Sequence, residues 1–296
     1  MPRRHESIAD MIARLLLILL LGLGLASAPP AHADDIDTEH LFGFMIGSDV
    51  GALGEREFQS QSTARLGRDG GRFRALQQQF ELEFVPAPNV RVEVGSGFAA
   101  HDIAGVQGLD DRQQFSWQGA SIELRTRLLE RERAPFGLTL AFEAKGNRIE
   151  ETSALPAQRF GAEWTLALDR ELLPNRLLAA VNLFYEPEWS RRLGAAATER
   201  ESTLGAAAAL MARLSPRLLL GGEARYLRKY EGIGLTELAG QALFVGPTVH
   251  VTLTKRSWLT AAWSVQAFGR PAGASASLDP VHFDRQQLRL VYGVNF

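Results

Sequence analysis

The sequence predicts an all-β protein, a closed antiparallel transmembrane β-barrel of about 12 strands. Three observations point to this fold. Apolar and polar residues alternate along most of the chain beyond about Glu55, which is typical of strands with one apolar and one polar face. No stretch after residue 33 approaches the ~18 apolar residues of a spanning helix. The connections are alternately short and long, as in barrels with short periplasmic turns and longer extracellular loops.

Residues 1–33 have the features of a secretory signal peptide. Three arginines precede or begin the apolar run 15–25, and residues 31–33 (Ala-His-Ala) form a small-x-small cleavage site. The run is short for a membrane-spanning helix of about 20 residues. We therefore expect cleavage between Ala33 and Asp34 and export of the mature chain.

Charge and composition argue against several classes of function. The whole chain has a formal charge of −2, and removal of three arginines and two acidic residues with the signal peptide makes it −3. We expect no nucleic-acid partner, since such a protein would show a basic stripe. The chain has no cysteine, which excludes disulfides, thiolate metal sites, cysteine nucleophiles and lipoprotein attachment. The sequence contains no HExxH pattern, phosphate-binding glycine loop or nucleophile elbow, so we expect no cofactor or metal.

Residues 34–54 are expected to form an N-terminal periplasmic or plug segment ahead of the barrel. After an acidic start, the stretch 41–51 is apolar and contains three glycines. Its composition leaves two readings open: a short strand, or a segment folded at or into the periplasmic mouth.

Residues 55–296 are predicted to form the barrel. Alternation marks the strands, and Pro-Asn pairs at 88–89 and 174–175 mark two of the short turns. Longer polar connections are expected at 101–113, 146–157, from 186 onward, and at 231–240, with another before the last strand. The expected strands are about 55–66, 74–84, 90–100, 114–128, 136–145, 160–169, 177–185, 202–214, 218–226, 243–253, 259–267 and 288–296.

The last strand carries a further signal. Its apolar and more polar positions alternate strictly: Leu288, Leu290, Tyr292, Val294 and Phe296 against Arg289, Val291, Gly293 and Asn295. This ending resembles the C-terminal signature of Gram-negative outer-membrane β-barrels, which marks a chain for the barrel-assembly machinery. The resemblance implies an outer-membrane location, contact with outer-membrane lipid, and an assembly role for Tyr292 and Phe296.

A second resemblance lies at the entry to the barrel. Phe42-Gly43, the run 47–51, Gly54-Glu55 and Glu57 are similar to the entry of poorly characterised barrels grouped with the outer-membrane proteins of aromatic-degradation (meta-pathway) operons. It implies a transporter-like role and assigns no residue a task.

The inward faces of the predicted strands carry the candidate functional residues. These lumen or constriction candidates are Glu81, Glu83, Arg91, Glu93, Glu123, Arg125, Arg127, Glu143, Lys145, Glu163, Glu223, Arg225 and Arg289. One interpretation is a ladder of unlike charges that face each other across neighbouring strands and rigidify a narrow lumen. The other is a polar pathway that selects a solute through its charges. Interleaved signs would fit a neutral or zwitterionic solute.

The sequence thus favours a channel or transporter for small solutes and leaves two alternatives. The barrel could be a non-conducting structural or adhesive protein that acts through its extracellular loops. It could also be an outer-membrane hydrolase: the pair His101-Asp102 lies near Asp110-Asp111 in one expected loop and His282 is close to Asp284 in another, and a histidine with carboxylates at the rim could activate water. We expect no enzyme, because solvated loop residues explain these histidines more simply.

Overall fold

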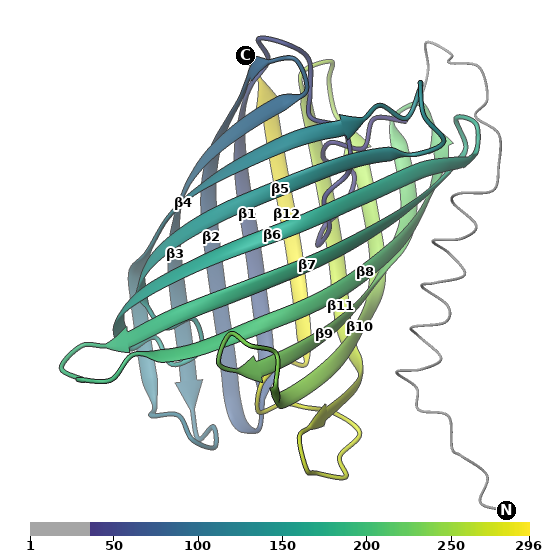
Figure 1. The fold of residues 1–296 in the computed structure, drawn as a ribbon. Helices are drawn as coiled ribbons and strands as arrows, with labels where there is room; N and C mark the ends of the chain where they lie inside the picture. Colours follow the sequence, from purple (N-terminus) through teal and green to yellow (C-terminus); the bar gives the residue numbers. More distant parts are fainter. Residues whose placement is uncertain (1–35) are drawn as a thin grey trace, which may run out of the picture.

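The computed structural model describes residues 36–296, and the predicted signal peptide lies outside this range. These residues form a closed barrel of twelve antiparallel strands (Figure 1). Each strand pairs with its sequence neighbours, and β1 closes the ring against β12. The strands are β1 (Arg56–Arg68), β2 (Gly70–Ala87), β3 (Val90–Ala104), β4 (Arg112–Leu129), β5 (Gly137–Ile149), β6 (Pro156–Leu173), β7 (Leu177–Arg192), β8 (Glu199–Ser215), β9 (Leu218–Glu231), β10 (Glu237–Thr252), β11 (Ser257–Pro271) and β12 (Gln286–Asn295).

Apolar side chains cover the outer wall, as the alternation predicts. On β2, for example, Leu76, Phe80 and Leu82 are 52%, 41% and 49% exposed, while the intervening Glu81 is 8% exposed. Ile122, Leu140 and Trp164 continue this exposed apolar surface on β4 to β6. No helix among residues 36–296 is long and apolar enough to span a bilayer.

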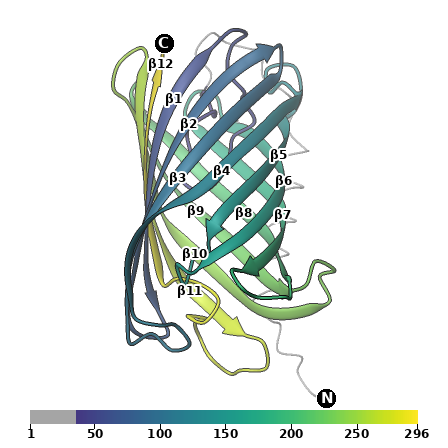
Figure 2. The ribbon, with the colours of Figure 1, turned by 90° about the vertical axis from the view of Figure 1, so that its left-hand side faces the viewer.

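The two ends of the barrel differ. The C-terminus and the start of β1 lie at one end, together with the turns 88–89, 174–176 and 216–217 (Figures 1 and 2). Outer-membrane barrels have their termini and short turns on the periplasmic side, so we call this the periplasmic end and the opposite one the extracellular end. The short–long alternation has two exceptions: residue 69 alone joins β1 to β2, and the periplasmic connection 130–136 is as long as most extracellular loops.

Several strands are longer than the alternation predicts. The strands run from 10 to 18 residues, whereas about 9–11 suffice to cross a bilayer. His101 lies in β3 rather than in a loop, and β7 continues through the Glu186–Trp189 stretch. Pro187 suggested a turn because proline is depleted in strands, yet it pairs with Ser202 in the β7–β8 ladder.

Residues 36–54, which we call the plug segment, resolve the choice left open by the sequence. They contain no strand. The purple trace in Figure 1 enters the barrel from the periplasmic end and turns back inside it. In the described chain, its backbone–backbone hydrogen bonds to a strand occur at its C-terminal end: Gly54 N–H donates to Val85 O, and adjoining Glu55 accepts from Val85 N–H.

Candidate functional site: a plugged lumen

Side chains of the barrel wall hold the plug segment by its backbone. Asp169 on β6 accepts hydrogen bonds from Ser48 N–H at 2.7 Å and from the Ser48 hydroxyl at 2.8 Å. Glu223 on β9 accepts from the backbone N–H groups of Gly43 at 2.7 Å and Phe44 at 2.9 Å. A buried loop must satisfy its backbone polar groups, and here the wall supplies the partners.

Two arginines hold the tip of the plug segment. The guanidinium carbon of Arg225 lies 4.0 Å from the centre of the Phe44 ring, and that of Arg289 lies 4.6 Å from it. Arg289 also donates to Gly43 O at 3.0 Å. Asn182 on β7 both donates to Ile46 O and accepts from Ile46 N–H. The tip is therefore bound from opposite sides of the lumen.

Apolar side chains of the plug segment pack in a buried cluster with residues of β7, β8 and β9. Small inward residues on β8, including Ala207 and Ala209, leave room for plug side chains. This explains why the predicted strand at 202–214 is rich in alanine. The buried cluster comprises Ile36, Leu41, Phe42, Met45, Leu178, Ala180, Ala207, Ala209, Met211 and Leu219.

Two ionisable groups of the plug segment, Glu39 and His40, pack against wall residues at the periplasmic end. Arg91 contacts Glu39 at 2.7 Å, and His40 stacks on Trp258 with ring centres 4.3 Å apart. Burial raises the pKa of the Glu39 carboxyl, although the Arg91 guanidinium acts in the opposite direction. Burial and the charges of Arg91 and Arg125 lower the pKa of His40 well below its usual value, so its ring is neutral at neutral pH.

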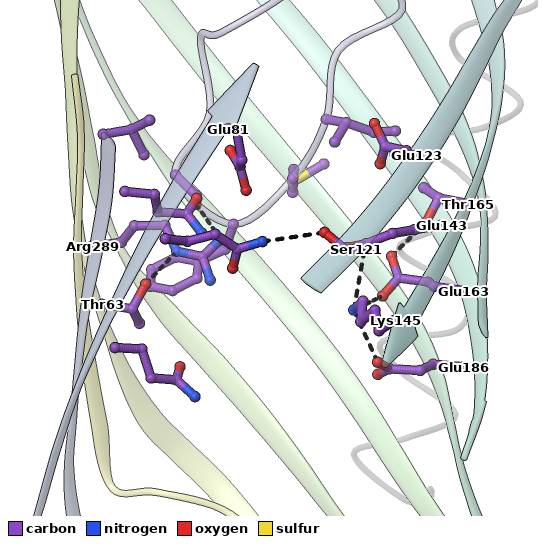
Figure 3. Close-up of a pocket in the computed structure, with 18 of the residues that line it drawn as sticks. Thr63, Glu81, Ser121, Glu123, Glu143, Lys145, Glu163, Thr165, Glu186 and Arg289 are labelled. Carbon is purple, nitrogen blue, oxygen red and sulfur yellow. Dashed lines mark hydrogen bonds and ion pairs between the residues drawn. The ribbon is translucent and has the colours of Figure 1, made fainter. Parts of the chain in front are cut away.

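A cavity of about 510 Å³ lies in the lumen against the tip of the plug segment, and Figure 3 shows part of its lining. Phe42 to Ile46 line it on the plug side, and Glu151, Lys229 and His282 contribute from the extracellular part of the barrel. Its volume falls in the range of about 300–1,000 Å³ that small-molecule sites occupy.

The two walls of this cavity carry opposite charge. Strands β8 to β12 and β1 contribute four basic residues and no carboxylate to the lining: Arg65, Arg225, Lys229 and Arg289. Strands β2 to β7 contribute seven carboxylates and only three basic residues: Glu81, Glu83, Glu93, Glu123, Glu143, Glu163 and Glu186, with Arg91, Arg125 and Lys145. The signs alternate locally along the sequence but are segregated across the lumen.

Like charges, not unlike charges, face each other across neighbouring strands. Glu83 pairs in register with Glu93, Glu93 with Glu123, Glu123 with Glu143, and Glu143 with Glu163, while Arg91 pairs with Arg125. The predicted ladder of directly opposed unlike charges is therefore wrong. Long basic side chains instead reach carboxylates two residues away or on a diagonal: Lys145 Nζ lies 3.1, 3.5 and 3.1 Å from Glu143, Glu163 and Glu186.

A network of ion pairs lies at the extracellular end of the lumen. Asp284, in the loop before β12, is 1% exposed and contacts Arg65 at 2.7 Å and Arg68 at 2.8 Å. Arg65 also reaches Glu151 of the β5–β6 loop at 3.3 Å. Burial alone would raise the pKa of Asp284, but the two guanidiniums hold it below its usual value. This network ties two extracellular loops to β1.

Eleven of the thirteen lumen candidates line the cavity. The exceptions are Glu223, which holds the plug segment, and Arg127, which contacts Asp49 and Glu130 near the periplasmic end. Sequence reasoning did not include Glu186 because Pro187 suggested a loop. The role of the thirteen lumen candidates in selecting a solute remains a prediction.

The candidate catalytic histidines are not arranged as expected. His101 is 4% exposed and its Nε2 lies 3.0 Å from Glu151 O, whereas Asp102 pairs with Arg72. His282 Nδ1 lies 2.9 Å from Asp279, not against Asp284, whose carboxylate is engaged by Arg65 and Arg68. Asp284 is therefore not the partner of His282, and His282 has Asp279 in its place.

Comparison with known proteins supports the fold. A family described as "Family of unknown function (DUF6662)" matches residues 34–296. No protein with a curated description matches the sequence.

Among solved structures, the COG4313 outer membrane channel from Pseudomonas putida F1 is similar with a TM-score of 0.59 and 12% identity, over 84% of this chain and 98% of that chain. The translocator domain of the autotransporter NalP from Neisseria meningitidis has a TM-score of 0.48 and 16% identity, over 97% and 96% of the two chains. The KdgM porin in complex with disordered oligogalacturonate has a TM-score of 0.44 and 10% identity, over 81% and 99%. The closed twelve-strand topology and the likeness to the COG4313 channel confirm the expected outer-membrane β-barrel fold.

Proposed function

We propose that this chain, which belongs to the family of unknown function DUF6662, is an outer-membrane channel for small solutes whose plug segment acts as its gate. This proposal rests on a polar cavity inside a closed barrel, bounded by a segment that forms no strand and whose described residues before Gly54 make no backbone–backbone hydrogen bond to the barrel.

The attachment of the plug segment suits a gate. Its contacts with the wall before Gly54 are made to side chains such as Asp169, Asn182 and Glu223. Withdrawing it would break these contacts and leave every strand–strand hydrogen bond in place. The ladder bonds of Gly54 and Glu55 with Val85 would then act as the hinge.

A second candidate function is a non-conducting structural barrel. The observation that favours it is the number of buried partners on the plug segment and the ion pairs that tie the extracellular loops to β1. On this alternative, the plug segment stays in place and the lumen is a rigid core.

Conductance separates the two functions. We expect the refolded mature chain in a planar bilayer to show infrequent openings, and a variant lacking residues 34–54 to show steady ones. Heat-modifiable mobility on gels provides the control that both barrels are folded. A folded variant that remains silent would contradict the channel and favour the structural barrel.

For cellular context, we propose that Tyr292 and Phe296 serve as the assembly signal. Tyr292 is 39% exposed and Phe296 is 68% exposed. Phe296 N–H donates to Arg56 O, so this residue lies beside the β1–β12 seam that closes the barrel.

A further inference from the structure

The acidic wall of the cavity already contains one ammonium-binding arrangement. Three carboxylates from β5, β6 and β7 surround Lys145 Nζ at 3.1 to 3.5 Å. Figure 3 shows this group on one side of the lumen, across from Arg289. An ammonium has three donors; here Lys145 Nζ donates a hydrogen bond to Glu186 and forms ion pairs with Glu143 and Glu163.

A second set of three carboxylates lies on the same wall. Carboxylate oxygens of Glu81, Glu83 and Glu93 all lie within 4.8 Å of one another, and all three residues line the cavity. Arg91 approaches Glu83 at 2.8 Å and Glu93 at 3.9 Å, and Arg125 approaches Glu93 at 3.8 Å. Neither arginine lies within ion-pair distance of Glu81.

Glu81 is the independent indication of a ligand. It is 8% exposed, and within residues 36–296 it has neither a hydrogen bond nor an ion pair with another side chain. A buried carboxylate is costly unless it is paired. Its side chain lines the cavity, so a partner can reach it from there.

We propose that Glu81, Glu83 and Glu93 bind the ammonium group of a small organic cation within the cavity. The assignment rests on the channel function proposed above and names the solute class for that lumen. The ammonium group of the ligand would form an ion pair with Glu81, as the Lys145 ammonium does with Glu163. Met45, Ile46, Phe184 and Leu227 also line the cavity and give a short hydrocarbon body apolar surface.

The basic wall does not offer an equivalent site for an anion. Arg65 is held by Asp284, and Lys229 by Glu201 at 2.9 Å. Arg225 donates to Gln287 at 2.7 Å, and Arg289 donates to Thr63 at 3.0 Å. The guanidinium groups of both arginines also lie over the Phe44 ring. The basic groups are therefore committed to the protein, whereas the acidic wall has an excess of carboxylates. A cation fits this cavity better than the zwitterion suggested by interleaved signs.

The test is direct binding of n-butylammonium chloride to the folded full barrel, measured by saturation-transfer NMR. Glu81→Gln is the informative variant because Glu81 makes no direct hydrogen bond or ion pair with a described side chain and acts on Arg289 and Arg125 only through longer-range charge, so folding should be preserved. We expect at least tenfold weaker binding in Glu81→Gln, recovery in Glu81→Asp, and less than a twofold change in Glu237→Gln. Glu237 is an exposed residue at the start of β10, outside the cavity lining, and it makes the same change in charge.

Two further ligands complete the experiment. n-Butanol and butyrate should not compete, because they lack the ammonium. Binding of calcium without binding of the amine would overturn the ammonium assignment in favour of an inorganic cation. Equal amine binding by wild type and Glu81→Gln would overturn the site.

The binding assay needs no conduction, so it separates this inference from the proposed channel. Amine binding by a silent barrel would support the site and contradict the channel. Conduction without amine binding would support the channel and contradict the amine site. For a conducting plug-deleted barrel, a KCl gradient should give a cation-selective reversal potential that moves toward zero in Glu81→Gln.

Discussion

Asp169 illustrates how one lumenal carboxylate positions a segment far away in the sequence. It is fully buried and accepts from Ser48 twice and from Arg131 at 2.7 Å. Alternation alone predicts that Asp169 faces inward. Its partner lies 121 residues away and has no sequence signature. The sequence therefore predicts which side chains face the lumen but not which of them hold the plug segment.

Replacing Asp169 with asparagine should loosen the plug segment. Hydrogen bonds to charged groups contribute roughly 1.5–3 kcal/mol, so the undocked population should rise about ten- to hundredfold. Proteinase K cleavage within residues 36–54, followed by mass spectrometry, would report this increase. Glu163→Gln is the matched control, since Glu163 lies on the same face of β6 and contacts Lys145 rather than the plug segment. Equal cleavage of the two variants would contradict the anchoring role.

At the scale of strands, period-two alternation predicts the membrane-crossing parts well and their extracellular ends poorly. The signal depends on a lipid-facing apolar row, and beyond the bilayer that requirement ends. The ladder nevertheless continues, as it does through Pro187 and His101. The register between neighbouring strands could not be predicted either, because alternation assigns a face to each residue but does not align one strand with the next. For that reason the facing row of glutamates was not predicted.

The two faces of β2 should respond oppositely to a new charge. Leu82→Arg places a cation against lipid and should destabilise the folded barrel by about 2–4 kcal/mol if the site lies near the midplane. Gln79→Arg, on the cavity side of the same strand, should have a much smaller effect. Urea unfolding in lipid vesicles, followed by tryptophan fluorescence, measures both. Similar losses of stability would contradict the assignment of faces.

At the scale of the whole molecule, strand tilt turns the aligned glutamates into a rising path. Barrel strands tilt by about 35–45°, so a row of partners in register climbs around the wall. Glu57, near the periplasmic start of β1, pairs with Glu83, and the row reaches Glu163 well inside β6. The segregated walls of the cavity arise from this combination of register and closure.

Locking the plug segment in place shows whether its movement opens the lumen. Gly137 lies where the plug segment approaches β5, and a Cβ there would be 2.8 Å from Ser48 Cβ. A disulfide needs about 3.5–4.5 Å between Cβ atoms, so Ser48→Cys with Gly137→Cys requires a shift of roughly 1 Å in the plug segment. The Asp169 carboxylate, 2.9 Å from the same added Cβ, must also move slightly. The chain has no other cysteine to interfere.

Single-channel conductance of this double variant is the decisive measurement, with each single cysteine variant as control. The oxidised protein should be silent, and openings should appear when a reductant is added to the same bilayer, while both controls ignore the reductant. Equal conductance before and after reduction, with the disulfide verified by mass spectrometry, would show that solutes pass without movement of the plug segment and would contradict the gate.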